Sequence, residues 1–453
     1  MTLRLAALPL ALLLCAGTGV RAAEIVDANN VIAMQQPGRT LEDFFTAALN
    51  NNPELNISRE RWAVMTARKD QTNGQLLPQI TANANVSDNE RQETARPEIT
   101  YTGERYTLQL SQVLFNWGAF AARGQAYLLE DQSESEYYAQ VAQLLTEVAD
   151  AYLGVLQQED ALGSIESEYE AMTNQLDRVQ DLYDLQLARI TDLYDAQARL
   201  AAIQAERVTI ESELALAREN LRAVSGLEAG ALARLPEEIA VQPLQDGLDV
   251  WLQRTRENNR LIEARQLALQ AAEKQVSRQR GAHMPRVSLV VQQQNTNTGF
   301  DNILLPSGRT DSTYVGLDFS VPIFSGGSAR AGVREAQSMR NIAANELRQA
   351  ELDLIEQTRN DFLLVRAGEA RIEAGQALAE STDTSYTAML EGFELGTVTS
   401  VDVLNALRDR FRAERDLQAA RYDHIRAGLA LRRDAGVLTA DDMRGISDLL
   451  NVR

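Results

Sequence analysis

The chain repeats four sequence landmarks in the same order, and this repetition limits its fold more than any other feature. NNPEL at 51–55 returns as NNRLI 207 positions later, and LLPQI at 76–80 returns as HMPRV at the same distance. LSQVLFNWG at 110–118 returns as FSVPIFSGG after 209 positions, and TDLYDA at 191–196 returns as VDVLNA after 210. A unit near 200 residues is too long for a solenoid repeat. Each half is therefore predicted to be a whole structural unit, and function to depend on two equivalent halves standing side by side.

The first 22 residues have the features of a secretory signal peptide. Arg4 supplies the positive start, the apolar core at 5–14 is too short to cross a membrane, and small residues at 20–22 suit cleavage after Ala22. Cys15, the only cysteine, is predicted to leave with this segment. Lipid attachment at Cys15 is the less favoured alternative, because Leu14 is larger than the residue such sites prefer. Without Cys15, disulfides and thiolate sites are excluded.

Charge and motif content argue against several classes of function. The formal net charge of -20 disfavours nucleic-acid binding, which needs clustered Lys and Arg. The sequence has no Gly-rich phosphate loop and no nucleophile with a matching base. His283 and His424 have no ligand partner three or four positions further on, so they are interpreted as ordinary polar residues. We expect no enzymatic activity, no cofactor and no metal.

Long helices are predicted in equivalent places of the two repeats. No proline occurs between Pro97 and Pro236, or after Pro322, and both stretches are rich in good helix formers. The first stretch keeps one apolar residue in every seven over six heptads, a coiled-coil pattern. These residues are Val141, Val148, Val155, Leu162, Tyr169, Leu176 and Tyr183. A helix over 119–187 would be about 100 Å long at ~1.5 Å per residue, which a globular core does not need.

Before each long helix, two runs alternate apolar and polar residues and are predicted as strands, joined by polar loops at 88–103 and 295–311. The apolar positions are Ile80, Ala82, Ala84 and Val86; Tyr106, Leu108 and Leu110; Val287, Leu289 and Val291; and Val315, Leu317, Phe319, Val321 and Ile323. Alternation alone fits either a membrane barrel with a wet lumen or a half-buried antiparallel sheet. Export and the adjoining long helices favour the barrel. Four strands cannot close one, so several copies would have to pool their strands.

Together, the order, spacing and duplication of these motifs resemble the TolC family of outer-membrane channel proteins over essentially the whole mature chain. The resemblance implies an α+β membrane protein with an internal two-fold repeat. It also implies a homotrimer whose shared 12-stranded outer-membrane β-barrel continues into a long periplasmic α-helical tunnel. Such a protein lies in the outer-membrane lipid and is the exit duct of an export system. Its partners would be a periplasmic adaptor and an inner-membrane transporter of RND, ABC or MFS type. The motifs leave open whether drugs, metals or secreted polypeptides pass through it.

On this reading the chain divides into six segments. They are a signal peptide (1–22), an N-terminal segment (23–39), the first repeat (40–226), an equatorial linker (227–242), the second repeat (243–436) and a C-terminal tail (437–453). Each repeat is predicted as a helix, two strands, a long helix, a tip turn and a helix.

The resemblance also implies which residues form the periplasmic entrance. Its constriction would involve Thr191, Asp192, Phe393, Val398, Asp402 and Asn405. The adaptor would dock at the two helix turns, through Leu187, Ala188, Arg189 and Ile190 in the first and Leu395, Gly396 and Thr397 in the second. The best-known members lock the entrance with a Tyr and an Arg, which this chain replaces with Phe393 and Val398. We therefore expect packing rather than that polar network to hold the entrance shut. An acidic residue in a first helical turn also has a simpler role as a helix cap, and this applies to Asp192 and Asp402.

Two other classes of protein stay open from sequence. A periplasmic or secreted coiled-coil scaffold without channel activity would explain the heptads but would leave the four amphipathic strands without a role. A lipid-anchored periplasmic binding protein would require modification of Cys15.

Overall fold

The computed structural model describes residues 39–92, 98–234, 244–300 and 308–439. The predicted signal peptide with Cys15, nearly all of segment 23–39, the part of the linker after 234 and the tail after 439 lie outside these residues. Among the helices that the structure describes, none has a stretch long and apolar enough to cross a membrane.

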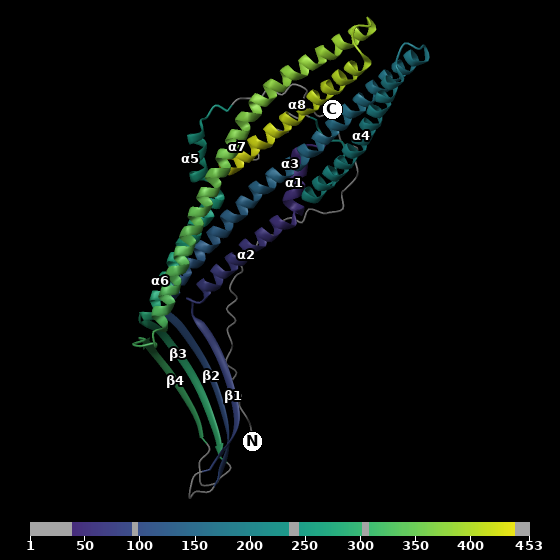
Figure 1. The fold of residues 1–453 in the computed structure, drawn as a ribbon. Helices are drawn as coiled ribbons and strands as arrows, with labels where there is room; N and C mark the ends of the chain where they lie inside the picture. Colours follow the sequence, from purple (N-terminus) through teal and green to yellow (C-terminus); the bar gives the residue numbers. More distant parts are fainter. Residues whose placement is uncertain (1–38, 93–97, 235–243, 301–307, 440–453) are drawn as a thin grey trace. The chain divides into compact units, whose positions relative to one another are not determined.

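The two repeats contain the same elements in the same order (Figure 1). The first repeat comprises α1 Leu41–Asn51, α2 Pro53–Gly74, β1 Gln79–Arg91, β2 Ile99–Asn116, α3 Trp117–Asp184 and α4 Ile190–Ser225. The second comprises α5 Leu248–Asn258, α6 Arg260–Arg280, the 3-10 turn η1 Gly281–His283, β3 Arg286–Phe300, β4 Gly308–Ser320, α7 Ser328–Glu394 and α8 Ser400–Asp434. Each repeat begins with two helices, where the sequence predicted one, and continues with two strands, a long helix, a turn and a last helix.

An asparagine of the duplicated NN motif divides these two helices in both repeats. The side chain of Asn52 accepts hydrogen bonds from the first amides of α2, and Asn259 does the same for α6, so each is a helix N-cap. The amide groups of the same side chains also donate to the last turns of α4 and α8. Asn52 Nδ2 lies 3.3 Å from the carbonyl oxygen of Val224, and Asn259 Nδ2 lies 2.8 Å from that of Asp434. In each repeat, one asparagine thus caps the second helix and ties it to the end of the last helix.

Glycine is required beside each of these junctions. Gly226 follows α4 with φ +77°, and Gly436 lies just beyond α8 with φ +65°. A Cβ added at Gly436 would lie 2.4 Å from the carbonyl oxygen of Asn258, and one at Gly226 would lie 3.2 Å from Cβ of Asn51. Positive φ and close backbone approach both favour glycine, so the two junctions are built in the same way.

The strands form one antiparallel sheet in the order β1-β2-β3-β4. They differ in length from the prediction. The supposed loop 88–103 begins and ends as paired strand, because β1 runs to Arg91 and β2 starts at Ile99, and loop 295–311 shortens likewise. In contrast, β4 stops at Ser320, so the prediction of strand at Val321 and Ile323 was wrong for the single chain. Pro322 has no N–H to donate, and β4 is an edge strand of the described sheet, so its outer side has no partner there.

The two long helices, α3 and α7, make most of the contacts between helices. α3 has 68 residues and α7 has 67, close to the predicted helix over 119–187. α3 packs against α2, α4, α6 and α8, whereas α7 packs against α5, α6 and α8. The largest cluster surrounds the fully buried Tyr152, whose hydroxyl donates to the carbonyl oxygens of Arg39 and Ala233. The heptad residues Val148 and Val155 are also fully buried there.

Candidate functional site

The turn between α7 and α8 has the tight geometry predicted around Gly396. This residue has φ +75°, and the amide and hydroxyl of Thr397 both donate to the carbonyl oxygen of Gly392 at 2.9 Å. Val398 packs over Gly392 so closely that a Cβ there would lie 2.6 Å from its Cγ2. Phe393 is half-buried on the same turn. The turn therefore has no side-chain hydrogen bond at the Phe393 and Val398 positions, whose side chains are apolar.

The turn between α3 and α4 repeats this geometry without a glycine. Gln186, 210 positions before Gly396, has φ +62° and is the one non-glycine residue of positive φ that the described residues contain. The amides of Leu187 and Ala188 both donate to the carbonyl oxygen of Leu182. Both turns expose large apolar side chains, with Leu187 at 74% and Leu395 at 80%. Ile190 and Arg189 complete the exposed surface of the first turn.

The two acidic residues near the turns have local partners. Asp402 forms a capping box with Thr399, whose hydroxyl donates to the carboxylate at 2.6 Å. This hydrogen bond holds the pKa of Asp402 below its usual value. Asp192 accepts from Arg189 at 3.1 Å and from the hydroxyl of Thr191 at 3.3 Å. Both therefore have the simple capping or first-turn role, and Asp402 keeps its charge at physiological pH.

A polar link joins α4 to α8 where the sequence had suggested only packing. Arg199 Nη2 donates to Oδ1 of Asn405 at 2.9 Å, and both residues are partly buried. A second polar link, made of ion pairs, joins α3, α4 and α8. The apolar cluster that includes Ala196 and Leu404 joins the same three helices. Arg415 of α8 lies 2.5 Å from buried Glu168 of α3 and 3.7 Å from Glu206 of α4.

Sequence reasoning placed Asn405 near the entrance but missed both arginines. Arginine is scattered along these helices as a helix former, and no local spacing distinguishes the two that bridge. The sequence predicted only that the links at positions 393 and 398 would be missing, and it gave no sign of these other inter-helix contacts. The structure uses residues other than those at 393 and 398.

The sheet has the predicted apolar and polar faces, and its register places all four apolar runs on one face. Residues Ile80, Leu110, Val291 and Val315 lie directly opposite one another in a row across the four strands. The next row on the other face consists of Thr81, Gln109, Gln292 and Tyr314. The apolar side chains are solvent-exposed on the edge strands, with Ile80 at 67% and Val315 at 66%, whereas Leu110 and Val291 are partly exposed.

The apolar residues form an oblique band across the sheet. From the shared row, those of β1 and β2 continue towards the pair Ala84 and Tyr106. Those of β3 and β4 continue in the opposite direction, towards Val287 and Phe319. An oblique band of this kind can match a flat apolar layer only if the strands are tilted relative to the layer's normal. Strands of membrane barrels are tilted in this way.

The described residues contain no group of three or more His, Cys, Asp or Glu side chains that could hold a metal ion. The candidate site is therefore a set of surfaces: two exposed helix turns, inter-helix links above them and an exposed apolar strand face.

Comparisons with known proteins agree with this architecture. The sequence profile described as "Outer membrane efflux protein" matches residues 45–227 and 251–437, one segment in each repeat. Outer membrane protein TolC of Vibrio cholerae is 26% identical over 415 residues, covering 91% of this chain and 94% of its own. The alkaline protease secretion protein AprF of Pseudomonas aeruginosa is 26% identical, covering 89% and 85%. Among solved structures, the outer-membrane channel OprN superposes with a TM-score of 0.78 at 22% identity, covering 88% of this chain and 90% of its own.

Proposed function

This chain belongs to the outer membrane efflux protein family, and on that premise we propose that three copies close a single duct through the outer membrane. Membership confirms the resemblance drawn from the duplicated motifs, the TolC-like α+β fold and the outer-membrane location. The chain is an outer-membrane exit duct of the efflux and secretion type, and its relatives are channel proteins rather than enzymes. The number of copies, the route through the entrance and the docking surfaces are proposals.

The observation that best supports assembly of several copies is the difference in burial between the equivalent helices α2 and α6. The repeat offset of 207 places Ile57 and Val64 of α2 on Ala264 and Ala271 of α6. Ala264 and Ala271 are 1% and 2% exposed, in a helix that packs against α3 as well as α7. Ile57 and Val64 are 52% and 47% exposed, because among the described helices α2 has α3 on one side and no counterpart on the other.

The missing counterpart is available on another copy. A groove of about 830 Å³ lies over the free face of α2. The helix equivalent to α3 is α7, which exposes Met339 and Ile342. If α7 of one copy packs on α2 of the next, as α3 packs on α6 within the chain, the contact is head-to-tail and closes into a ring. Three copies give the 12 strands that the family resemblance implies.

The duplication also predicts how the strands of two copies pair. Leu110 of β2 lies opposite Val291 of β3. Moving both by the repeat offsets places Phe319 of β4 opposite Ala84 of the partner subunit. The β2–β3 pair shifts register between Val113 and Phe115, and Pro322 falls at the equivalent of Val113. Proline is tolerated at such an irregularity. The segment after Ser320 therefore becomes strand on assembly, which explains why Phe324 is 88% exposed in one chain.

Cysteine cross-linking tests this arrangement. In a variant with Cys15→Ser, the pair Phe319→Cys and Ala84→Cys should oxidise to linked dimers and trimers on non-reducing gels. Within one chain β2 and β3 separate the two positions, so a bond must join two copies. The matched control is Phe319→Cys with Ile80→Cys, displaced by four residues or roughly 13 Å along the strand. Monomers only, or equal linkage by the control pair, would refute the proposed ring and register.

At the other end of the duct, we place the entrance at the two helix turns. Thr191, Asp192, Asp402 and Asn405 would face the constriction, and Phe393 and Val398 would pack behind it. The exposed Leu187 and Leu395, with Ala188, Arg189, Ile190, Gly396 and Thr397, would contact a periplasmic adaptor that couples the duct to an inner-membrane transporter. A photo-crosslinking residue at Leu187 or Leu395 should capture the adaptor, and one at the partly exposed Val250 of α5 should not. Equal capture at Val250 would remove the turns as the docking site.

A further inference from the structure

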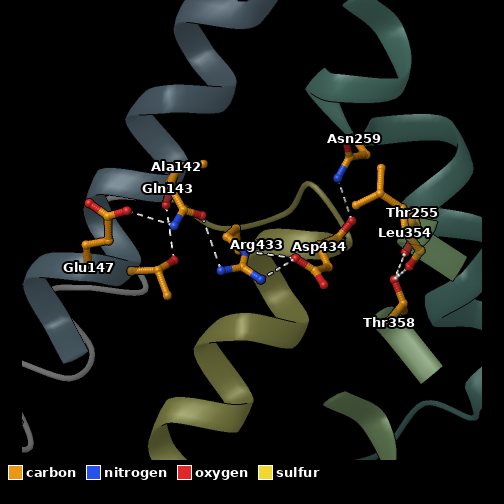
Figure 2. A network of polar contacts seen from close by, with 10 residues as sticks. Ala142, Gln143, Glu147, Thr255, Asn259, Leu354, Thr358, Arg433 and Asp434 are labelled. Atoms are coloured by element: carbon orange, nitrogen blue, oxygen red, sulfur yellow. Dashed lines mark hydrogen bonds and ion pairs between the residues drawn. The ribbon is translucent and has the colours of Figure 1, made fainter. Parts of the chain in front are cut away.

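The end of α8 is held by a buried polar network in the second repeat (Figure 2). Asp434 is 2% exposed, and Oδ1 of its carboxylate accepts from the guanidinium of Arg433 at 2.8 Å. Arg433 also donates to Gln143 of α3 at 3.3 Å, and the side-chain amide of Asn259 donates to the main-chain oxygen of Asp434. α8 is thereby tied to α3 and to the start of α6. Beside it, the fully buried hydroxyls of Thr255 and Thr358 lie 2.9 Å apart and join α5 to α7.

The equivalent junction of the first repeat is apolar. By the repeat offsets, the places of Thr255, Thr358, Asp361, His424 and Asp434 are taken by Ala48, Val148, Ala151, Leu214 and Val224. These belong to or pack against the main hydrophobic cluster. Both junctions otherwise share the same asparagine cap and glycine, so the titratable groups at these positions distinguish the second junction from the first.

Two carboxyl groups meet inside this network. The carboxyl group of Asp361 on α7 lies within hydrogen-bonding reach of that of Asp434, and the two charges act on each other. Oδ2 of Asp434 is buried and has no donor among the described residues. Two ionised carboxylates are both acceptors, so a hydrogen bond between them requires a shared proton. Burial, followed by the charge of Asp434 and the hydrogen bond to it, raises the pKa of Asp361 to about 7.

The surrounding charges do not replace that proton. The cation that acts on Asp361 is Arg433, which already pairs with Asp434 Oδ1 and reaches Gln143. From α3, Glu147 accepts from Gln143, and Asp150 has a pKa raised by burial while Arg426 and Arg433 oppose the shift. The α5 side of the contact presents the neutral Thr255. His424, further along α8, has a pKa lowered by burial, so it titrates on the acidic side of its usual value.

We propose that Asp361 and Asp434 form a proton-binding joint that fastens the end of α8 to α7 in the second repeat alone. With one proton shared, the contact is a hydrogen bond; without it, two like charges face each other in a buried site. The joint then loosens, while the apolar first junction stays closed. Its place in the duct wall rests on the proposed function, but proton binding is a property of the isolated protein and can be tested without channel activity.

The direction of the pH effect follows from linkage. The pKa of Asp361 in the closed joint is about 7, against the 3.8 of a free aspartate. The closed joint therefore holds a proton that the opened joint releases throughout this interval. Local opening should become about tenfold more frequent for each pH unit up to roughly pH 6.5 and level off above pH 7.

Hydrogen-exchange mass spectrometry on the full-length protein in detergent tests this, after correction for the intrinsic pH dependence of exchange. Between pH 5 and pH 8, protection at 425–436 should fall, while peptides at 215–226 in the first junction should stay constant. Asp361→Asn should remove the pH dependence and retain protection at pH 8. The matched control is Asp353→Asn, which removes an exposed carboxylate from the same helix and should behave as the unchanged protein does.

Constant protection at the second junction, or equal loss at both junctions, would overturn the proposal. If Asp361→Asn does not fold, infrared spectroscopy of the unaltered protein gives a second measurement. A protonated-carboxyl band should disappear as pH rises through about 7, and Asp434→Asn should shift its midpoint. The absence of a band that titrates near neutrality would also overturn the proposal, whether or not the duct conducts.

Discussion

The side chain of Asn405 bridges two helices that no local sequence pattern connects. It accepts from Arg199 of α4, while its neighbour in the first turn of α8, Asp402, is committed to the cap with Thr399. The capping role of Asp402 could be predicted, because acid in a first helical turn is a local signal. The bridge could not, because its two members lie 206 positions apart.

We predict that this bridge helps hold the entrance shut. Arg199→Met and Asn405→Leu should each raise single-channel conductance in planar bilayers, and the double variant should add little to either. A hydrogen bond from a charged donor in a partly exposed site is worth about 1 kcal/mol, or roughly fivefold in the closed-to-open ratio per copy. Arg408→Met is the control, because Arg408 pairs with Asp409 on its own helix. Strictly additive effects would mean that the two residues act separately.

At the scale of elements, the strand faces and long helices follow from period-two and heptad patterns, which are local. The strand ends were harder to predict. Residues beyond Asp88 are polar on both faces, so their pairing in β1 leaves no alternation to detect. The apolar residues Val321 and Ile323 continue the alternation beyond the end of β4. They cannot form strand in a single chain, because their partner strand belongs to another copy in the proposed ring. The split between α5 and α6 depends on Asn259, which the sequence analysis recognised only as part of a duplicated motif.

The two asparagine junctions predict unequal losses of stability. Asn259→Ala removes a helix cap and a buried hydrogen bond to Asp434, which together should cost about 2 kcal/mol. Asn52→Ala should cost closer to about 1 kcal/mol, because its bond to Val224 is longer and less buried. Asn259→Ser keeps a capping oxygen and loses the amide donor without adding a charge, so it separates the two contributions. Thermal unfolding followed by circular dichroism gives the ranking, and a larger loss for Asn52→Ala would contradict this account.

At the scale of the whole molecule, the sequence shows two repeats, but the surroundings of equivalent elements differ within a single chain. α6 is covered on both sides, α2 on one. The same incompleteness appears at the free edges of β1 and β4. Assembly about a threefold axis would supply both missing neighbours and would bring any charge near a helix turn into a ring.

That ring predicts a cation-preferring duct. Rings of carboxylates select cations, and the chain has a net charge of -20. In bilayers under a salt gradient, the reversal potential should have cationic sign, and Asp402→Asn should reduce it. Because the Thr399 hydroxyl lowers the pKa of Asp402 below 3.8, the preference should survive acidification until the pH falls below that value. Thr399→Val should move the loss to higher pH while leaving the carboxylate in place. An anion-selective current, or an acid midpoint unchanged by Thr399→Val, would show that Asp402 lies away from the conducting path.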